Sequence, residues 1–214
     1  ISSTNDAFGY PFVEIGDATG DGVPDYFIGA PYELVFFPGT GNTVEVGAAY
    51  LYDGATGTRR WRRISPHPDA YNRFGDSAAP LGDLDGDGRA DVLVGESGGN
   101  MVHAVSGATG AVFYTVESLE GSFGRTRVAV GDLNGDGVSE VAVSSESTLE
   151  GLYRGRVRIL SGATGDVLRV IEAPVPQDIN FFGRSMSAAG DLDGDGAVDL
   201  IMSSQRVASG GIPD

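Results

Sequence analysis

A nine-residue loop that occurs four times constrains this chain more than any other feature. The copy at Asp83–Asp91 (DLDGDGRAD) has oxygen-bearing side chains at positions one, three, five and nine, and glycine at positions four and six. The other copies are Asp17–Asp25 (DATGDGVPD), Asp132–Glu140 (DLNGDGVSE) and Asp191–Asp199 (DLDGDGAVD). A Phe-Gly pair stands nine residues before every first Asp, at 8–9, 74–75, 123–124 and 182–183. This common spacing indicates a repeat architecture.

The density of oxygen atoms in these loops predicts calcium sites. Ca²⁺ takes six to eight oxygen ligands in a flexible geometry, and a glycine at position six permits a sharp turn. We expect the side chains at positions one, three, five and nine, and the backbone carbonyl at position seven, to bind up to four Ca²⁺ ions. The predicted ligands are Asp17, Thr19, Asp21, Val23 and Asp25; Asp83, Asp85, Asp87, Arg89 and Asp91; Asp132, Asn134, Asp136, Val138 and Glu140; and Asp191, Asp193, Asp195, Ala197 and Asp199. The first and third loops have fewer carboxylates, so we expect weaker binding there.

Two other structures could contain such loops. An EF-hand needs a bidentate Glu at position twelve between two helices. That position is apolar in every copy, and each loop is followed by a short apolar run typical of a buried strand. The loop is therefore predicted to join two strands. Ordinary Asp- and Gly-rich turns are the simpler alternative, but four copies in one register argue against them.

A second signature recurs between alternating segments. It reads DGATG at 53–57 and SGATG at 106–110 and 161–165. A short Gly-containing connection between two strands predicts a hairpin turn, which we favour over a ligand-binding loop. Each unit then has four strands, in the order strand, metal loop, strand, strand, Gly-Ala-Thr-Gly turn, strand. Such units are typical of propeller blades. The Phe of each Phe-Gly pair is predicted to be blade core, with the Gly allowing close packing between blades.

These motifs together resemble the FG-GAP repeat. A Phe-Gly pair, a short strand, Gly-Asp-x-Asp/Asn-Gly-Asp-Gly and an apolar strand ending in Gly29-Ala30-Pro31 are the residues that carry the resemblance. The family builds the β-propeller of integrin α-subunits and of many secreted bacterial proteins. The resemblance covers nearly the whole chain, although the Gly-Ala-Pro is replaced at 95–97, 144–146 and 203–205.

The resemblance implies an all-β propeller of antiparallel, four-stranded blades over a single region, 1–214. We expect full blades at 8–73, 74–122 and 123–181, and part of a fourth at 182–214. Closed propellers have four to eight blades, and this family closes with seven. The chain is therefore expected to be a piece of a larger propeller, which we favour, or to have open edges that another copy completes.

Composition limits the partners and the compartment. The net charge is −16, and 14 of the 30 acidic residues are predicted metal ligands, which argues against nucleic-acid binding. The absence of cysteine excludes disulfides and thiolate zinc sites. No apolar run is long enough to cross a bilayer, and the first ten residues do not form a signal peptide. Weak calcium modules suit an extracellular or cell-surface location.

Other candidate chemistry is sparse. No G-x-S-x-G, H-E-x-x-H or P-loop pattern occurs, so we expect no enzyme activity. His103 is predicted to be a packed strand residue. The basic run at 59–63 (RRWRR) has two interpretations: a partner-binding stripe formed by Arg60, Trp61 and Arg62, or an outer strand whose arginines balance nearby acids, which we favour.

Three hypotheses for function remain open. The first is a secreted, calcium-stabilised propeller module that binds a protein or glycan, as the family resemblance implies. The second is a structural protein that self-assembles through open blade edges. The third is a non-catalytic module of a larger secreted enzyme. The sequence identifies no ligand, because a fold supports many functions.

Overall fold

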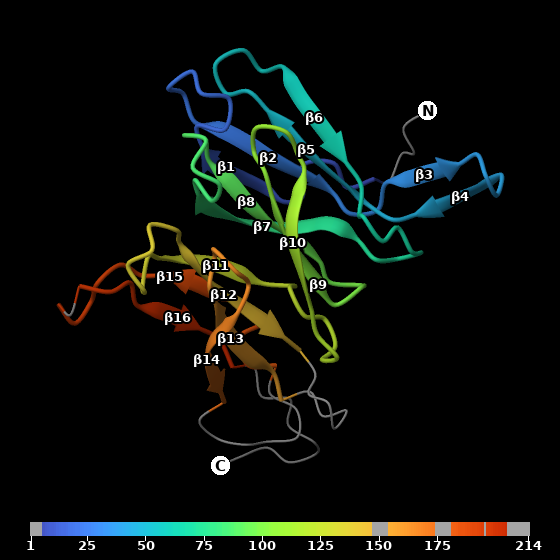
Figure 1. Ribbon diagram of the computed structural model, residues 1–214. Helices are drawn as coiled ribbons and strands as arrows, with labels where there is room; N and C mark the ends of the chain where they lie inside the picture. The colour runs from blue at the N-terminus through green and yellow to red at the C-terminus, as the bar shows by residue number, and fades with distance from the viewer. Residues whose placement is uncertain (1–5, 147–153, 174–180, 195, 205–214) are drawn as a thin grey trace.

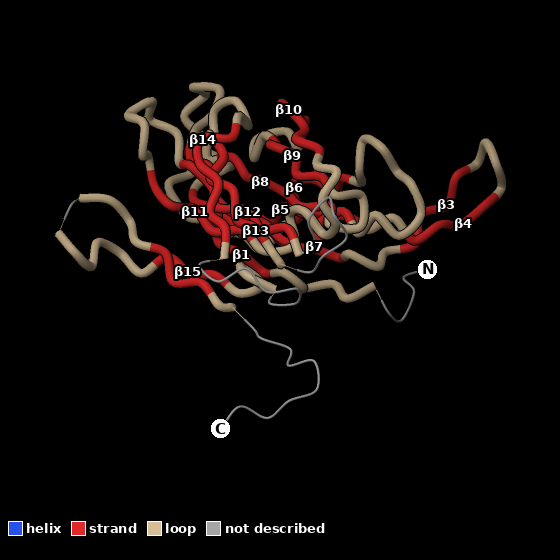
Figure 2. The backbone as a smooth tube through the Cα atoms, turned by 90° about the horizontal axis from the view of Figure 1, so that it is seen from below, coloured by secondary structure: helices blue, strands red, loops and turns tan. Residues whose placement is uncertain are grey.

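Strands alone form the regular structure of the described residues. The computed structural model describes residues 6–146, 154–173, 181–194 and 196–204. It contains three four-stranded sheets and two two-stranded sheets (Figure 1). Seen from below, β1, β7 and β15 lie toward one side of the fold, and β10 and β14 lie toward the other (Figure 2). The all-β propeller architecture predicted from the repeats is confirmed.

The first blade is an antiparallel sheet in the order β1-β2-β5-β6. Its strands are β1 (Phe12–Gly16), β2 (Asp25–Ala30), β5 (Ala48–Tyr52) and β6 (Arg59–Arg63). The segment after β2 forms a separate hairpin of β3 (Leu34–Phe37) and β4 (Asn42–Glu45), which projects away from the blade (Figure 1).

The second and third blades repeat this four-stranded meander. The second consists of β7 (Phe74–Gly82), β8 (Asp91–Glu96), β9 (Met101–Val105) and β10 (Val112–Glu117). The third consists of β11 (Arg127–Gly131), β12 (Glu140–Ser145), β13 (Arg156–Leu160) and β14 (Val167–Glu172). The fourth unit has β15 (Met186–Ala188) and β16 (Leu200–Met202) within the described residues. In every unit the metal loop joins the first strand to the second, as predicted.

The hydrophobic core lies between neighbouring blades. One cluster joins Phe27 and Leu51 of the first blade to Phe74 and Val94 of the second. Comparable clusters join the second blade to the third, and the third to the fourth. Strands β8 and β12 are buried along their whole length. This explains their continuous apolar runs, because a strand that is covered on both faces needs no polar alternation.

The Phe-Gly pairs belong to these contacts between blades. Phe74, Phe123 and Phe182 are buried, as predicted for blade core. Phe8 differs: it is 53% exposed and packs edge-on against the rings of Tyr50 and Tyr52. The expectation of a buried Phe is therefore wrong at Phe8. The described residues place no blade before the first one, so no neighbouring sheet covers its ring.

The fourth strand of each of the first two blades reaches the turn of the next blade. The indole Nε1 of Trp61 donates to the carbonyl oxygen of Gly107 at 2.7 Å. The hydroxyl of Tyr114 donates to the carbonyl oxygen of Gly162 in the same way. Trp61 and Tyr114 each stand four residues after the last glycine of their own Gly-Ala-Thr-Gly turn. The turns are therefore docking points for the preceding blade.

Two glycine substitutions in the Phe-Gly pairs are expected to distinguish the free-energy cost of backbone strain from that of lost packing between blades. Gly9 and Gly75 both have positive φ (97° and 85°), but a Cβ at Gly9 meets no atom within 4 Å, whereas one at Gly75 would overlap the carbonyl of Ala48. We expect Gly9→Ala to cost about 1 kcal/mol through strain, and Gly75→Ala to cost about 2 kcal/mol more. Urea unfolding measures both. Equal costs would contradict the proposed contact between blades.

Candidate metal centres

The first Asp of each loop closes the turn through the backbone. In the second loop, Oδ1 of Asp83 accepts from the N–H of Gly86 at 2.8 Å and of Asp87 at 3.1 Å, and Oδ2 accepts from the N–H of Gly88 at 2.8 Å. The other three loops repeat this pattern from Asp17, Asp132 and Asp191. Both glycines have positive φ (77° and 80°), which side chains rarely adopt. The D-x-x-G-D-G spacing thus has a local structural cause.

Backbone hydrogen bonds also set the charge state of the first position. The N–H of Gly22 is the largest influence that lowers the pKa of the Asp17 carboxyl. The N–H of Gly137 has the same effect on the pKa of Asp132. Both carboxylates are therefore held in their charged form, which is the form that binds a metal ion.

The ninth position links the metal loop to the second signature. Oδ2 of Asp91 accepts from the N–H of Leu84 at 2.7 Å, and Oδ1 accepts from the N–H of Gly107 at 2.9 Å. Asp25 makes the same bonds, to Ala18 within its loop and to Gly54 in the turn of its own blade. The Gly-Ala-Thr-Gly turn is thus a hairpin turn, as predicted, and also a partner of the loop. The contact between loop and turn was not predicted. The sequence signal that could have indicated it is that both signatures occur in each of the first three units.

The second and fourth loops gather three carboxylates each. One oxygen from each of Asp83, Asp85 and Asp91 lies within 4.8 Å of the others. Asp91 is buried, and this burial raises its pKa to about 6, with further repulsion from Asp85 and Asp87. The fourth loop brings Asp191, Asp193 and Asp199 together in the same way. A divalent cation would relieve such repulsion, so these residues fit Ca²⁺.

The first loop fits a cation through an unsatisfied atom. Asp17 and Asp25 keep their positions, and Thr19 stands at position three. The hydroxyl oxygen of Thr19 is buried and has no hydrogen-bond partner. Buried polar atoms are rarely left without a partner. A calcium ion at this loop would supply one.

The third loop fits a cation less well. The side-chain amide of Asn134 donates to Oδ2 of Asp136 at 2.9 Å and to Oε1 of Glu140 at 3.0 Å. Oε2 of the buried Glu140 accepts from the N–H of Leu133 at 2.5 Å. The amide protons therefore balance two carboxylates without a metal ion, which agrees with the weaker binding predicted for this loop.

The predicted ligands at position seven of the first three loops contact position five through their backbone. The residues at position seven donate their N–H to the side chain at position five: Val23 to Asp21, Arg89 to Asp87 and Val138 to Asp136. The carbonyls of these residues and of Ala197 stay predicted ligands. Asp195 lies outside the described residues.

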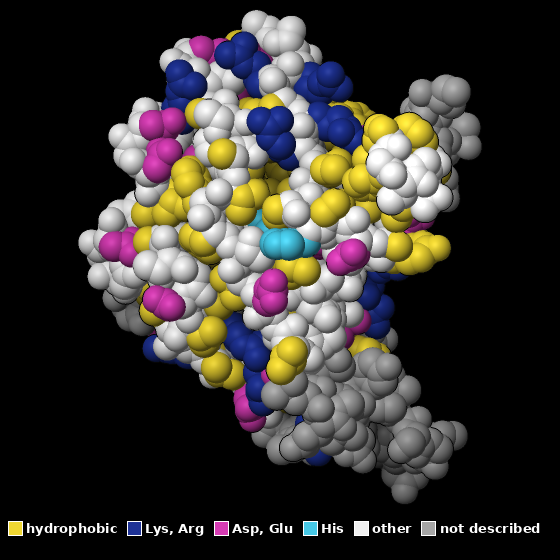
Figure 3. Space-filling view, turned by 45° about the vertical axis from the view of Figure 1, so that its right-hand side comes forward, with side chains coloured by type: hydrophobic (Ala, Val, Ile, Leu, Met, Phe, Trp, Pro, Cys, Tyr) yellow, Lys and Arg dark blue, Asp and Glu magenta, His cyan; other side chains and the backbone are white. Residues whose placement is uncertain are grey.

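The basic run on β6 is accounted for by contacts within the chain. Figure 3 shows arginines gathered at the upper end of the molecule, where β6 lies in Figure 1. Trp61 is 7% exposed and contacts the next blade, so it is not a surface anchor. Arg62 pairs with Glu33 at 2.6 Å, and Arg60 lies 3.8 Å from Asp53. These contacts favour the outer-strand interpretation of this run.

A buried polar network in the second blade was not predicted. Glu96 accepts from the hydroxyl of Ser65 at 2.7 Å and from the amide of Asn72 at 2.5 Å. Its carboxylate also lies 2.7 Å from Nε2 of His103. His103 is a packed strand residue, as expected. Ser65 and Asn72 come from the connection between blades, so this network could not be found from local sequence patterns.

Comparison with known proteins identifies the repeats. The profile of the FG-GAP-like repeat matches residues 83–143. Integrin alpha-5 of Xenopus laevis is 33% identical over 198 residues, which are 91% of this chain and 14% of that protein. Human integrin alpha-7 is 42% identical over 94 residues, 41% of this chain and 7% of that protein. This chain is an FG-GAP repeat protein of the integrin-like type.

The fold of the FG-GAP chain is also found at low sequence identity. The rhamnogalacturonan lyase of Bacillus licheniformis superposes with a TM-score of 0.55 at 17% identity, covering 94% of this chain and 43% of that one. This similarity concerns the fold alone. The FG-GAP chain spans a small part of the integrin relatives, 14% in the longest match. Its described residues contain no helix that could span a membrane.

Two substitutions in the second loop are expected to distinguish a carboxylate that holds the backbone from one that serves mainly as a predicted metal ligand. In chelator, Asp91→Ala leaves the N–H groups of Leu84 and Gly107 without an acceptor, so we expect it to lower the free energy of unfolding by about 2–4 kcal/mol. Asp85→Ala affects one exposed N–H and should cost less than about 1 kcal/mol in chelator. Urea unfolding tests this difference, and equal effects would contradict it.

Adding a carboxylate is expected to strengthen the third loop. Asn134→Asp removes the amide donors and restores the acidic pattern of the second loop, so calcium affinity should rise at least about tenfold. In chelator the same change should destabilise the fold, because three carboxylates would then repel one another. Calorimetry and urea unfolding measure the two effects. Asn42→Asp on the β3–β4 hairpin adds the same charge elsewhere and should change neither.

Proposed function

We propose that this chain is part of an extracellular interaction module whose FG-GAP blades are held by calcium. One observation carries the calcium proposal: carboxylate oxygens of Asp83, Asp85 and Asp91 lie within 4.8 Å of one another. The same loop accepts a hydrogen bond from the Gly-Ala-Thr-Gly turn of its blade. Similarity to integrin α-subunits supports the interaction role and the extracellular location. The partner class is a protein or a glycan.

The proposed calcium ions act on the scaffold. Each ion would neutralise the carboxylates of its loop and hold the first strand against the second. The ninth carboxylate transmits this order to the turn between the third and fourth strands. That turn also accepts a hydrogen bond from the side chain of Trp61 on the preceding blade. Metal binding would therefore stabilise both a blade and its contact with its neighbour.

We propose that the chain itself is not an enzyme. Ser65, Glu96 and His103 combine residue types that occur in catalytic triads, but the Ser65 hydroxyl donates to Glu96 and not to the imidazole. All three residues are buried. A nucleophile needs access to substrate and a neighbouring base, so this arrangement supports a structural role. A place beside a catalytic domain in a longer protein remains compatible with it.

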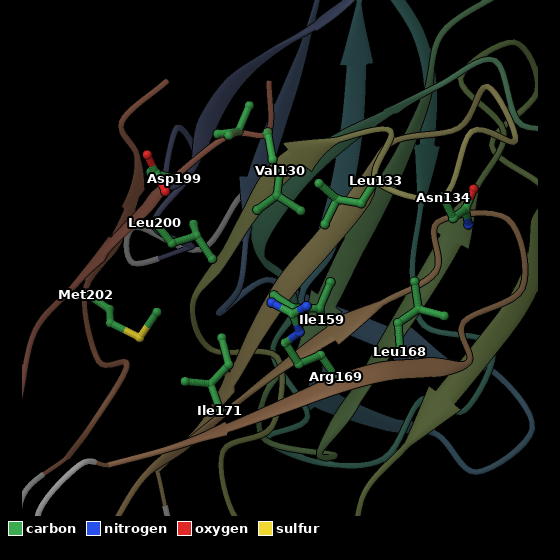
Figure 4. Close-up of a pocket in the computed structure, with 12 residues that line it drawn as sticks. Val130, Leu133, Asn134, Ile159, Leu168, Arg169, Ile171, Asp199, Leu200 and Met202 are labelled. Atoms are coloured by element: carbon green, nitrogen blue, oxygen red, sulfur yellow. The ribbon is translucent and has the colours of Figure 1, made fainter. Parts of the chain in front are cut away.

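Docking of further blades is a second candidate function. Phe8 is exposed on the leading face of the first blade. Toward the other end of the chain, a groove of about 570 Å³ lies between the third and fourth units (Figure 4). Arg169, four residues after the last glycine of its turn, lines this groove at the position that Trp61 and Tyr114 occupy in the other blades. These faces favour contact with another blade, from the same protein or a second copy.

Calcium removal tests the first proposal. At calcium a hundredfold above the dissociation constant, we expect the thermal midpoint to be about 5–10 °C higher than in chelator. Magnesium should stabilise less, because it demands a smaller octahedral site. An unchanged midpoint would refute structural calcium. Light scattering under both conditions tests the second candidate: a monomer at every concentration would refute association between copies.

The partner class is tested by binding in calcium. The chain is immobilised and offered an array of glycans and the matrix proteins of a cell surface. We expect at least one to bind, and to be released by chelator as the blades loosen. If no glycan or protein binds in calcium, the interaction role is wrong even if calcium stabilises the fold.

A further inference from the structure

A polar pocket lies at the end of the blades opposite the metal loops. The first strands β1, β7, β11 and β15 pack side by side, and the pocket of about 310 Å³ opens where they begin. Four of its residues occupy one position of the repeat, directly after a Phe-Gly pair: Tyr10, Asp76, Arg125 and Arg184. Tyr32 and Arg73 complete what we call the arginine pocket. The repeat thus brings one position, occupied by Tyr, Asp and two Arg, from four blades to one place.

The charges of the arginine pocket are held in position. Glu146 pairs with Arg125 at 3.1 Å and lies 3.7 Å from Nε of Arg184, so one carboxylate holds two guanidinium groups. Arg73 lies over the ring of Tyr32, 5.7 Å from its centre. No ion pair is found for Arg73 among the described residues. Three arginines from different blades therefore face one cavity.

The acidic residues near the pocket are already balanced. Asp76 lies 3.7 Å from the buried guanidinium of Arg127 and accepts from the hydroxyls of Ser77 and Ser97. The two carboxylates of Asp76 and Glu146 offset two of the four arginines at this place. The arginines are Arg73, Arg125, Arg127 and Arg184, so two positive charges remain. The whole chain has a net charge of −16. A cluster of positive charge in so acidic a protein favours an anionic ligand at this place.

The remaining lining indicates the chemistry of that ligand. Guanidinium groups bind carboxylates through paired N–H donors. Tyr10, Tyr32, Ser97 and Thr126 add hydroxyl groups to the lining, and Pro31 is the one aliphatic residue in it. The hydroxyls of Ser97 and Thr126 already donate, to Asp76 and to the carbonyl oxygen of Arg184, so they can still accept a hydrogen bond from a ligand. Tyr10 is 71% exposed, which leaves an aromatic face free for a sugar ring. Most of the lining is polar or charged, which suits the many hydroxyls of a sugar better than an apolar peptide side chain.

We propose that the arginine pocket binds a hexuronate residue of an acidic glycan. The carboxylate of the sugar would lie against Arg73, Arg125 and Arg184, and its hydroxyls against the surrounding side-chain oxygens. The proposal rests on the proposed function as an interaction module and specifies its ligand. It concerns the end of the blades away from the metal loops, so its variants should not change calcium binding.

The test uses the chain in calcium with trimers of galacturonate, glucuronate and mannuronate. Each trimer is paired with its methyl ester, which keeps the ring and removes the charge. Calorimetry should detect at least one acid trimer, with affinity falling as salt rises, and its ester at least about tenfold weaker. Equal binding of acid and ester would overturn the proposal.

Variants assign the binding to the pocket. Arg125→Ala and Arg73→Asn should each weaken the acid trimer at least about tenfold. Asn is chosen because Arg73 has a φ of 62°, which Asn tolerates. Arg59→Ala on β6 removes the same charge from an exposed strand and should bind like the unaltered chain. Thermal unfolding in calcium checks that each variant is folded. Full binding by both folded pocket variants would overturn the proposal.

The outcomes separate this inference from the proposed function. If a neutral glycan or a protein binds in calcium and no hexuronate does, the interaction role stands and the arginine pocket proposal fails. If an acidic peptide of Asp and Glu displaces the trimer and binds more tightly, the sugar assignment is overturned in favour of a peptide. If nothing binds in calcium, both fail.

Discussion

The structure depends on one carboxylate in each of the first two metal loops. The ninth residue, Asp25 or Asp91, accepts backbone N–H groups from its own loop and from the Gly-Ala-Thr-Gly turn of its blade. It therefore joins three strands of one sheet at one end. Because these carboxylates are buried beside other acids, their charge has a cost unless something balances it. The proposed calcium ions would provide that balance, and hence couple metal binding to the integrity of the blade.

Contacts between blades follow from the same repeat. The aromatic side chain on the fourth strand donates to the next turn, and the Phe-Gly pair packs against the preceding sheet. Each blade therefore buries its apolar residues only when a neighbour is present. This is the behaviour expected of repeat architectures, in which stability comes from interfaces between adjacent units. In the described residues, Phe8 has no neighbouring blade over its ring, and Arg169 borders a groove where the first two blades have a contact with the next turn.

The metal loops and the arginine pocket lie at opposite ends of the blades. The metal loops and turns lie at one end of the blades, where every copy keeps the first Asp, the fifth Asp and the two loop glycines. The opposite end contains the residues after each Phe-Gly pair, which are Tyr, Asp, Arg and Arg in the four units. A scaffold held at one end can thus vary its recognition residues at the other. The arginine pocket is the result of that variation in this chain.

The amino-acid sequence by itself determined the strands, the loops and the repeat, because hydrogen bonds within a turn and alternation along a strand depend on neighbours in the chain. Asp83 and its glycines could be assigned on spacing alone. Only the tertiary structure decided that Trp61 is buried, that Phe8 is exposed and that Asn134 balances Glu140. It also brought Arg73, Arg125 and Arg184 together. Those outcomes depend on which side chains meet across blades and on local orientation, and neither is encoded in the spacing of a motif.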